Sequence, residues 1–501
     1  MLKLTTDQIR QIWLDYFQSK GHYVLPSKSL IPDNDRSLLW INSGVATLKK
    51  YFSGIENPPS QRLTNSQRAI RTNDITNVGV TARHHTFFEM LGNFSIGDYF
   101  KKEAIEFAYD LLINHYQINK ESLYFTVFQD DHDAYEMWIT LGIKPDHIVK
   151  GDRNRNFWDI GQGPCGPCTE IYYDRGEKYD AKKIGIKLFV DDIENDRYVE
   201  IWNVVFSQFN NDGKNNYSEL ARKNIDTGAG LERLASISQD VPTDFDIDIF
   251  TPIIKSIENL CVKNHYDSNA YFTNDQSQTQ INRDYKIITD HIKASVFAIA
   301  DGAIPSNKER GSVLRKLIRR AMVCAKRLGI DGDFITPVTA AVIKVMKSYY
   351  PYLVEQQKNI IDVLMHESHT FQQTLERGYK LFNDAVNHQQ LNGATIFQLV
   401  ETYGFPFEII TDLAQLHNVK IDQDDYERRL KRHQDISRAN VENKGMLAQN
   451  GNLLAFTTPA TFDYDHLTLE HAKVIACFNE KFEPVNEIKN KGWVVFDQNV
   501  F

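Results

Sequence analysis

Residues 66–71 read Ser-Gln-Arg-Ala-Ile-Arg, and residues 86–94 read Thr-Phe-Phe-Glu-Met-Leu-Gly-Asn-Phe. Both runs predict β-strands that a loop joins into a hairpin, with Arg71 ending the first strand and Glu89 on the second. The fixed charge and planar fork of arginine suit a phosphate, and a carboxylate can accept a hydrogen bond from an adenine amino group. The hairpin therefore suits nucleotide binding, and a surface salt bridge is the alternative for the same two residues.

A third predicted strand covers residues 200–209, where large apolar side chains alternate with an amide. Because side chains alternate between the faces of a strand, one face is expected to be core: Trp202, Val204 and Phe206. Asn203 then shares the other face with Ile201, Val205 and Ser207. An amide among apolar neighbours is either a satisfied structural group or a ligand contact.

Residues 226–234 read Asp-Thr-Gly-Ala-Gly-Leu-Glu-Arg-Leu, a glycine pair that leads into a predicted helix. Backbone N–H groups at a helix start and the nearby Arg233 would suit a triphosphate. Asp226, directly before the glycines, is well placed to bind an ammonium group. A glycine turn that merely opens a helix is the alternative.

The stretch from Asn156 to Asp174 contains Trp158 and a C-x-x-C pair, Cys165 and Cys168. Such a pair can form half of a zinc site or a redox couple. No second pair follows at zinc-finger spacing, so we interpret the cysteines as packing groups of a rigid loop. Trp158 either walls a small pocket or belongs to the core.

The distribution of elements predicts an α+β protein with a mostly antiparallel sheet, because short β-rich runs alternate with helices and irregular insertions as far as residue 248. Beyond it, apolar residues recur at helical spacing, which indicates a mainly helical second domain. The expected domains are residues 1–248, residues 249–450 and a β-like segment at 451–501. We expect the chain to be a fragment of a longer protein.

A basic helix is expected at residues 312–328, where Arg315 and Arg319, and Lys316 and Arg320, form i,i+4 pairs. Such a face suits a phosphate backbone, and an ordinary solvated face is the alternative. The whole chain has a formal net charge of −9, which argues against a general nucleic-acid coat but permits a local basic face.

Five sparse cysteines in 501 residues do not resemble a disulfide framework. The N-terminus has no apolar signal segment, and no apolar run approaches the ~18 residues that span a bilayer. We therefore expect a cytoplasmic protein without a membrane partner, and a monomer by default.

Taken together, these motifs resemble class II aminoacyl-tRNA synthetases. The arginine and the Phe-x-Glu-like strand resemble motif 2, and G-x-G-x-E-R resembles motif 3. The first helix and the extended stretch with Pro26 and Pro32 look like motif 1. Residues 81–95, Gly163–Tyr172 and Ile225–Leu234 together resemble the alanyl-tRNA synthetase family in particular, and this resemblance runs essentially from end to end.

The resemblance implies an alanine–tRNA ligase that uses ATP with Mg²⁺ to form alanyl-adenylate and then charges tRNA(Ala). Arg71 and Arg233 would hold the α- and γ-phosphates. Residues lining the ATP site would be Glu89, Met90 and Gly230. The alanine pocket would be formed by Trp158, Asn203, Val205, Asp226 and Gly228, with Asp226 pairing the amino group. Arg71, Asp226 and Arg233 would carry the chemistry, and no catalytic serine, cysteine or histidine is expected.

The helical domain resembles the tRNA-recognition domain of the family. Asn307 and Glu408 would read a G·U pair of the acceptor stem in its wide minor groove, and Arg315, Arg319 and Arg320 would contact the backbone. The tail resembles the start of an editing barrel, but the zinc-binding H-x-x-x-H motif does not occur in this chain. We therefore expect no hydrolysis of seryl- or glycyl-tRNA.

Two positions depart from the family pattern. Only Thr72 separates Arg71 from Asn73-Asp74, where many members carry a longer insertion with a lysine. Glu408 stands where an aspartate is expected. The shorter loop leaves open a non-catalytic paralogue that binds RNA or a nucleotide. A class II-like adenylating enzyme that acts on something other than tRNA is a further alternative, against which the basic helical domain argues.

Overall fold

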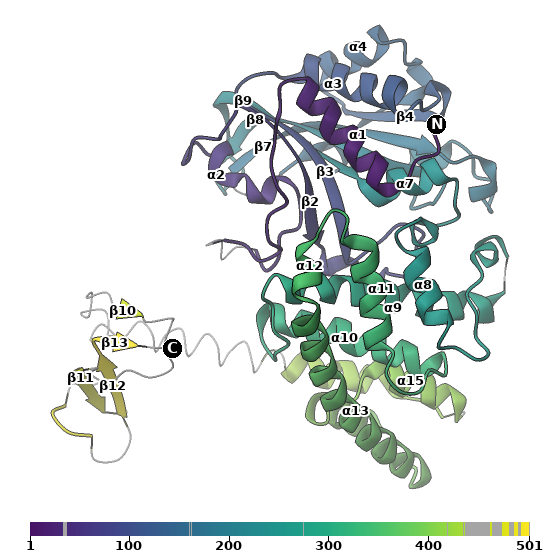
Figure 1. The fold of residues 1–501 in the computed structure, drawn as a ribbon, viewed down its shortest axis with the longest axis vertical. Helices are drawn as coiled ribbons and strands as arrows, with labels where there is room; N and C mark the ends of the chain where they lie inside the picture. The colour runs from purple at the N-terminus through teal and green to yellow at the C-terminus, as the bar shows by residue number, and fades with distance from the viewer. Residues whose placement is uncertain are drawn as a thin grey trace. The chain divides into compact units, whose positions relative to one another are not determined.

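The computed structural model describes residues 1–33, 38–159, 161, 163–273, 275–417, 419–433, 435, 461–462, 473–479, 485–488 and 492–499. The protein is α+β, as the sequence predicts, with a large sheet flanked by helices and followed by a helical region (Figure 1). The chain divides into two compact units, Met1–Gln372 and Gln373–Phe501. Everything that forms the candidate site lies in the first unit.

A nine-stranded sheet dominates the first unit in the described part of the chain, with the order β1-β2-β3-β9-β8-β7-β4-β5 and β6 paired to β7. The inner pairs from β2 to β4 are antiparallel, and only β1/β2 and β4/β5 are parallel. The strands are β1 (Tyr23–Val24), β2 (Arg62–Ile70), β3 (Phe87–Ile96), β4 (Leu123–Phe128), β5 (Ile148–Gly151), β6 (Phe157–Trp158), β7 (Gly163–Asp174), β8 (Tyr198–Asn211) and β9 (Tyr217–Gly230).

Helix α1 (Thr6–Ser19) begins at a capping box, in which the Thr5 side chain accepts the Gln8 N–H and the Gln8 side chain accepts the Thr5 N–H. Its apolar face lies on the sheet, where the Trp13 ring is 4.3 Å from the Trp202 ring between centroids. The expected core face of β8 is confirmed, because Trp202, Val204 and Phe206 are all buried. The opposite face of β8 is therefore left for a ligand.

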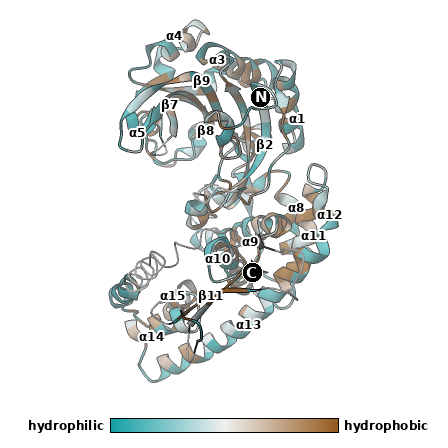
Figure 2. Cartoon of the chain, turned by 90° about the vertical axis from the view of Figure 1, so that its left-hand side faces the viewer, coloured by the Kyte–Doolittle hydropathy of each residue, from teal (hydrophilic) through white to brown (hydrophobic). Residues whose placement is uncertain are grey.

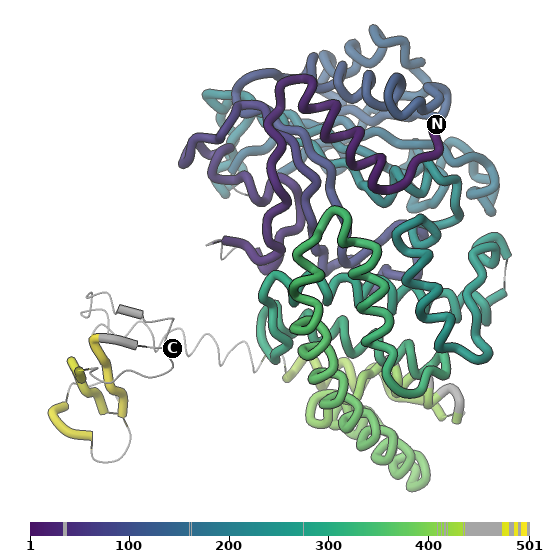
Figure 3. Tube along the Cα trace, in the orientation of Figure 1, coloured from purple at the N-terminus to yellow at the C-terminus, as the bar shows by residue number. Residues whose placement is uncertain are grey.

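The remaining helices of the sheet region are short connections between strands: α2 (Lys49–Phe52), α3 (Lys101–Asp110), α4 (His132–Thr140), α5 (Arg153–Asn156), α6 (Lys187–Val190) and α7 (Leu231–Gln239). The 3₁₀ turns η2 (Thr72–Thr76) and η7 (Asp244–Asp246) lie beside the candidate site. The tube in Figure 3 follows the chain from this region into a group of longer helices.

These longer helices begin at α8 (Thr251–Glu258), and their apolar faces form a second core (Figure 2). They are α9 (Gln276–Ala300), α10 (Glu309–Arg327), α11 (Ile335–Met346), α12 (Tyr352–Glu355) and α13 (Gln357–Asn387), which contains the division between the units. Helix α9 is buried along most of its length and packs on α10. No helix among the described residues is both long and apolar enough to cross a membrane.

The second unit contains α14 (Gly393–Phe397), α15 (Phe407–Leu416) and a helical segment at 423–433. Beyond it, strands β11 (Val474–Asn479) and β12 (Gly492–Phe496) pair in antiparallel fashion, and β10 (Thr461–Phe462) pairs with β13 (Gln498–Asn499). The polar stretch 443–452, expected to be a linker, lies outside the described residues.

Candidate active site

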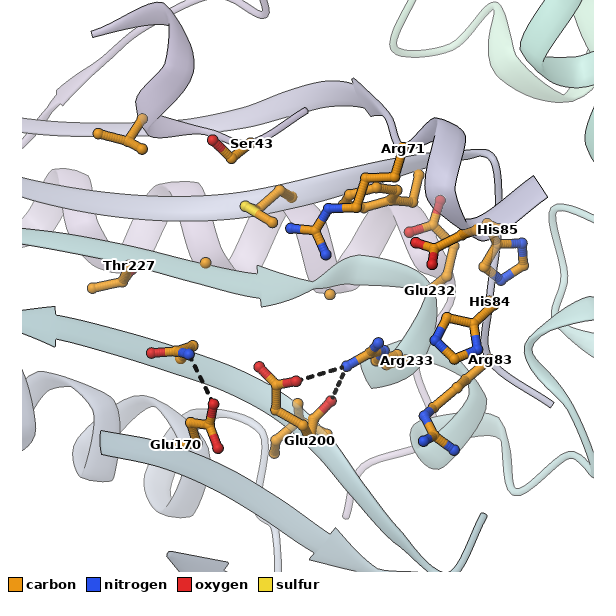
Figure 4. A pocket seen from close by; sticks show the side chains of 18 of the residues that line it. Ser43, Arg71, Arg83, His84, His85, Glu170, Glu200, Thr227, Glu232 and Arg233 are labelled. Carbon is orange, nitrogen blue, oxygen red and sulfur yellow. Dashed lines mark hydrogen bonds and ion pairs between the residues drawn. The ribbon is translucent and has the colours of Figure 1, made fainter. Parts of the chain in front are cut away.

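A cavity of about 330 Å³ opens on the free face of the sheet. The ends of β3, β8 and β9 form its floor, and side chains from η2, β6 and β7 form its walls (Figure 4). Nine of the residues predicted from the sequence line this cavity: Arg71, Met90, Trp158, Asn203, Val205, Asp226, Gly228, Gly230 and Arg233. Arg71 and Arg233, which are 162 positions apart in the chain, therefore meet at one place.

Strand register explains why the residues of β8 and β9 meet. Val205 lies opposite Asp226, and Asn203 lies opposite Gly228, so each pair shares one face of the sheet. Asn203 Nδ2 donates to Glu170 Oε1 over 3.1 Å. The amide is thus oriented by a carboxylate and lies on the cavity wall, which favours the ligand-contact interpretation of Asn203.

Asp226 is 7% exposed and faces the cavity. Burial alone raises the pKa of its carboxyl to about 7. A carboxylate without a cationic neighbour in a low-dielectric wall favours either a proton or a bound cation. This is the electrostatic environment expected of a group that binds an ammonium ion.

Gly228 sets the depth of the cavity beside Asp226. A Cβ atom at this position would lie 2.7 Å from Met90 Sδ, closer than real contacts allow. Met90 is held in turn by the Gly44 N–H, 3.3 Å from its sulfur. The missing side chain at Gly228 therefore lets Met90 lie against β9, and Met90 shapes a small apolar recess at this part of the cavity.

Two arginines face the other end of the cavity. Arg233 Nη1 donates to the Glu200 backbone oxygen over 2.8 Å and lies 3.3 Å from Glu200 Oε2 (Figure 4). Burial opposes the charge of Arg233, but the Glu200 and Asp244 carboxylates together outweigh it, so the pKa of the guanidinium is raised. Arg71 donates through Nε to Asn42 O over 3.2 Å and lies over the Phe88 ring at 4.9 Å. Both cations suit a polyanion such as a triphosphate.

Glu89 is not among the cavity residues. Strand alternation places Phe88 and Met90 on the cavity face and turns Glu89 to the opposite face, where it is fully buried. There Arg10 donates to its carboxylate through Nε and Nη2, both over 2.8 Å. Hydroxyl donors complete the site: Ser66 at 2.9 Å and Tyr350 at 2.8 Å. Glu89 thus forms a structural ion pair with Arg10, and we leave it out of the proposed ATP site.

Several cavity residues were not predicted from the sequence: Ser43, Val45, Asp74, Arg83, His84, His85, Phe88, Glu170, Glu200, Ile201, Thr227, Glu232 and Asp244. The run Arg83-His84-His85 was conspicuous in the sequence, since three basic side chains precede a strand. Glu170 and Glu200 gave no local signal, because a single acidic residue in a strand is usually a solvated group.

Glu170 and Glu200 bring two carboxylates to one wall of the cavity. Burial, and then the charge of Glu200, raise the pKa of Glu170 to about 8. Tyr172 donates to Glu170 Oε2 over 2.8 Å. Oxygen donors of this kind fit a hard cation such as Mg²⁺, which binds through one or two carboxylates together with substrate phosphates. In the described part of the chain, no group of three or more His, Cys, Asp or Glu side chains could itself hold a metal.

The C-x-x-C pair lies in strand β7, so the expected loop was wrong, but the expectation that the two cysteines serve packing is confirmed. Cys165 lies opposite Phe209 and Cys168 lies opposite Val205 on the neighbouring strand β8, and the register shifts between these two pairs. Both thiols are free and buried, and burial raises the pKa of each. Gly166 between them lies against β8, where a Cβ atom would come within 2.0 Å of Phe206 O. Tight strand packing therefore accounts for this motif.

The expected basic helix is confirmed as α10, but much of its charge is paired. Arg315 and Arg319 both contact the buried Glu367, at 3.1 and 2.9 Å. Arg315 also donates to Asn307 Oδ1, and Asn307 is exposed. Arg320 Nη1 donates to the Ile75 oxygen in η2 over 2.7 Å, which joins this helix to the turn that follows Arg71.

Glu408, the other residue expected to read RNA, belongs to α15 in the second unit. Its side chain lies outside the described residues. Its predicted contact therefore stays a prediction.

Comparison with known proteins adds a family assignment to this geometry. The model of the family described as tRNA synthetases class II (A) matches residues 8–501. An alanine–tRNA ligase of Mycoplasmoides gallisepticum is 55% identical over 496 residues, covering 99% of this chain and 55% of that protein. The Ureaplasma parvum serovar 3 alanine–tRNA ligase is 55% identical over 506 residues, covering 100% and 56%. The Mycoplasma pneumoniae enzyme is 52% identical over 500 residues, covering 100% and 55%. The chain thus spans about half the length of these curated relatives.

Proposed function

Because the chain belongs to the class II tRNA synthetase (A) family, we propose that it activates L-alanine with ATP and transfers it to the 3′ end of tRNA(Ala). One observation carries this proposal: a single cavity has a buried carboxylate, Asp226, at one end and two arginines, Arg71 and Arg233, at the other. An amino acid bound by its ammonium group at the first end would direct its carboxylate toward phosphates at the second.

In the first step, a carboxylate oxygen of alanine attacks the α-phosphorus of ATP, and the bond to the β-phosphate oxygen breaks. The products are alanyl-adenylate and pyrophosphate. The reaction needs alignment and charge stabilisation more than a protein nucleophile. Arg71 would hold the α-phosphate and Arg233 the γ-phosphate, while Met90 and Gly230 would line the adenine site.

Selection of alanine follows from the recess beside Gly228. Asp226 would pair the ammonium group, and Asn203, whose amide Glu170 orients, would contact the substrate carboxylate. Trp158 and Val205 would close the sides. Such a pocket excludes large side chains by overlap, but it discriminates weakly against smaller ones, since a methylene is worth only ~1–3 kcal/mol.

ATP would bring Mg²⁺ into the cavity, where Glu200 and Glu170 supply carboxylate oxygens. The ion would neutralise phosphate charge, and the residues of this chain would align the two substrates around it.

The transfer step would use a further substrate, tRNA(Ala), which the protein would bind through its acceptor stem. We propose that Asn307 and Glu408 read its G·U pair in the minor groove and that Arg315, Arg319 and Arg320 contact the backbone. The exposure of Asn307 at the start of a basic helix supports this assignment.

We further propose catalytic, tRNA-recognition and editing-related segments at residues 1–248, 249–450 and 451–501. Five free thiols suit a reducing cytoplasm. A monomer is the simplest state for this chain.

Alanine-dependent exchange of pyrophosphate into ATP tests the first step, with serine, glycine and no amino acid as controls. We expect exchange with alanine and much less with the others. Binding of ATP without any exchange would reject catalysis. It would favour the non-catalytic nucleotide- or RNA-binding alternative, which the short turn after Arg71 keeps open.

A further inference from the structure

A buried row of alternating charges lies behind the arginine end of the cavity. His85 is 4% exposed and stands between Asp244 of η7, at 2%, and Asp290 of α9, at 1%. His85 Nε2 is 3.5 Å from Asp244 Oδ2, and Nδ1 is 3.7 Å from Asp290 Oδ1. The imidazole thus has one carboxylate at each nitrogen, and both His85 and Asp244 line the inner wall of the cavity.

Packing fixes the orientation of this ring. The His85 imidazole stacks on Phe250 with centroids 5.1 Å apart and planes 10° apart, and it lies 4.6 Å from Phe245. Burial lowers the pKa of His85, but the two flanking carboxylates outweigh it and raise the pKa to about 9. The ring is therefore an imidazolium at neutral pH, because two buried carboxylates without a cation between them would be costly.

The same two aspartates also hold the backbone on both sides of His85. The Asp244 N–H donates to the Ala82 oxygen over 2.9 Å. Asp290 Oδ1 accepts the Thr86 N–H over 2.8 Å. The segment between these bonds carries Arg83 and His84, whose side chains reach into the cavity (Figure 4). The Asp244 backbone and the Asp290 carboxylate thus hold the two ends of a short loop that faces the arginine end.

Other charged groups near the ring come from each element packed on it. They are Asp244 from η7, Asp290 from α9 with His291 behind it, Glu232 from α7, and Lys286 and Lys293 from α9 near the two stacked phenylalanines. Loss of the imidazolium charge would leave the carboxylates in excess at the cavity wall.

We propose that His85 is a positioning residue for ATP binding: its imidazolium compensates Asp244 at the cavity wall and holds Arg83 and His84 against the phosphates. This inference rests on the proposed function for the identity of the ligand. His85 itself touches no reacting atom. It acts through Asp244, whose negative charge at the cavity wall is offset by His85 together with Arg233, so loss of the imidazolium would leave more negative charge facing the triphosphate.

Calorimetric titration with ATP and Mg²⁺ tests the inference directly, without requiring turnover. His85→Gln keeps hydrogen-bonding groups but removes the charge, so we expect the Kd for ATP to rise at least ~10-fold, as for misplaced binding groups. The KM for alanine in pyrophosphate exchange should stay within ~2-fold, because Asp226 lies at the other end of the cavity. In the wild type, the Kd for ATP should also rise above pH 9, where the imidazolium loses its proton, and His85→Gln should lack this rise.

The double variant His85→Gln/Asp244→Asn removes the imidazolium together with the carboxylate that lines the cavity, while the deeper Asp290 keeps its bond to the Thr86 N–H. It should bind ATP within ~3-fold of the wild type at pH 8. His22→Gln is the matched control. His22 is also buried, with its nitrogens 3.0 Å from Phe17 O and 2.9 Å from the Tyr99 hydroxyl, and it is not among the residues that line the cavity. It should change stability without changing the Kd for ATP.

An unchanged Kd for ATP in His85→Gln would overturn the inference, whether or not the wild type catalyses exchange. If His85→Gln does not fold, the double variant decides. A Kd for ATP close to that of the wild type, without the rise above pH 9, supports the inference. A weaker affinity for ATP in the double variant overturns it. Failure of the wild type to exchange pyrophosphate would count against the proposed function alone.

Discussion

Asp226 allows a prediction in which binding and stability change in opposite directions. Its carboxyl is 7% exposed, and burial raises its pKa from 3.8 to about 7. At ~1.4 kcal/mol for each pH unit, the ionised carboxylate is ~4 kcal/mol less favourable in the cavity than in water. An ammonium group bound beside it would offset this cost.

The pH dependence of alanine binding follows from the same value. Alanine needs the carboxylate, and a group with a pKa of about 7 is half ionised at pH 7 and about one-tenth ionised at pH 6. The KM for alanine should therefore rise about fivefold between pH 7 and pH 6 and change little between pH 8 and pH 9. Asp226→Asn should raise this KM by ~10²–10³ at pH 8 and remove the acidic dependence, since truncating one partner of a buried charge pair costs ~2–5 kcal/mol.

Stability should respond with the opposite sign. Between pH 4 and pH 7 the folded chain holds a proton that the unfolded chain releases, so the free energy of unfolding falls as pH rises through this window. Above pH 7 the Asp226 carboxyl is ionised, and the full cost of burying its charge lowers the stability of the folded chain. Asp226→Asn should then raise the free energy of unfolding by up to ~4 kcal/mol. The measurements are pyrophosphate exchange across pH 5.5–9 and urea unfolding at pH 8. A KM for alanine that is flat from pH 6 to 8 in the wild type would refute the reasoning.

Three further predictions follow from individual contacts. Arg233→Ala should lower adenylate formation in single-turnover assays by ~10²–10³, the scale for one preorganised charge contact, and an unchanged rate would reject its phosphate role. Asn307→Ala should leave pyrophosphate exchange intact but weaken charging of tRNA(Ala); equal losses in both assays would argue against RNA recognition. Glu89→Gln should lower the free energy of unfolding by ~3 kcal/mol through the broken Arg10 pair while leaving the KM for ATP within ~2-fold, and a selective loss of ATP affinity would return Glu89 to the nucleotide site.

The sequence predicts the fold well where local alternation decides it. Strand β8 is an example, because the sizes of Trp202, Val204 and Phe206 identify the core face and leave Asn203 and Val205 for the cavity. The helical boundary signals of α1 are equally local, since Thr5 and Gln8 are three residues apart. Such features depend on near neighbours and need no knowledge of the tertiary structure.

The position of Glu89 could not be predicted in this way. Alternation shows that Glu89 and Met90 face opposite sides of β3, but it does not show which side is covered by α1 and which is open. Arg10, the partner that fixes the answer, is 79 residues away in the chain. A carboxylate within a nucleotide-binding motif therefore turned out to be part of the core.

The charged row at His85 was missed for a related reason. Asp290 lies among the apolar residues of α9, and its contact with the Thr86 backbone spans 204 residues. The local sequence does not show whether a polar residue of a helix is buried in a hydrogen-bonded network or exposed to solvent. Only the folded chain shows which groups pair there.

The close contact between Gly228 and Met90 has a consequence for how this pocket can evolve. Because a Cβ at position 228 would overlap the Met90 sulfur, the two positions are linked and their substitutions should show strong epistasis. A single-site library would score Gly228 as intolerant of every change. A library that varies both positions includes combinations such as Gly228→Ala with Met90→Val, in which the total side-chain volume stays nearly constant. A side chain at position 228 would therefore be accommodated best when Met90 on the neighbouring strand changes with it.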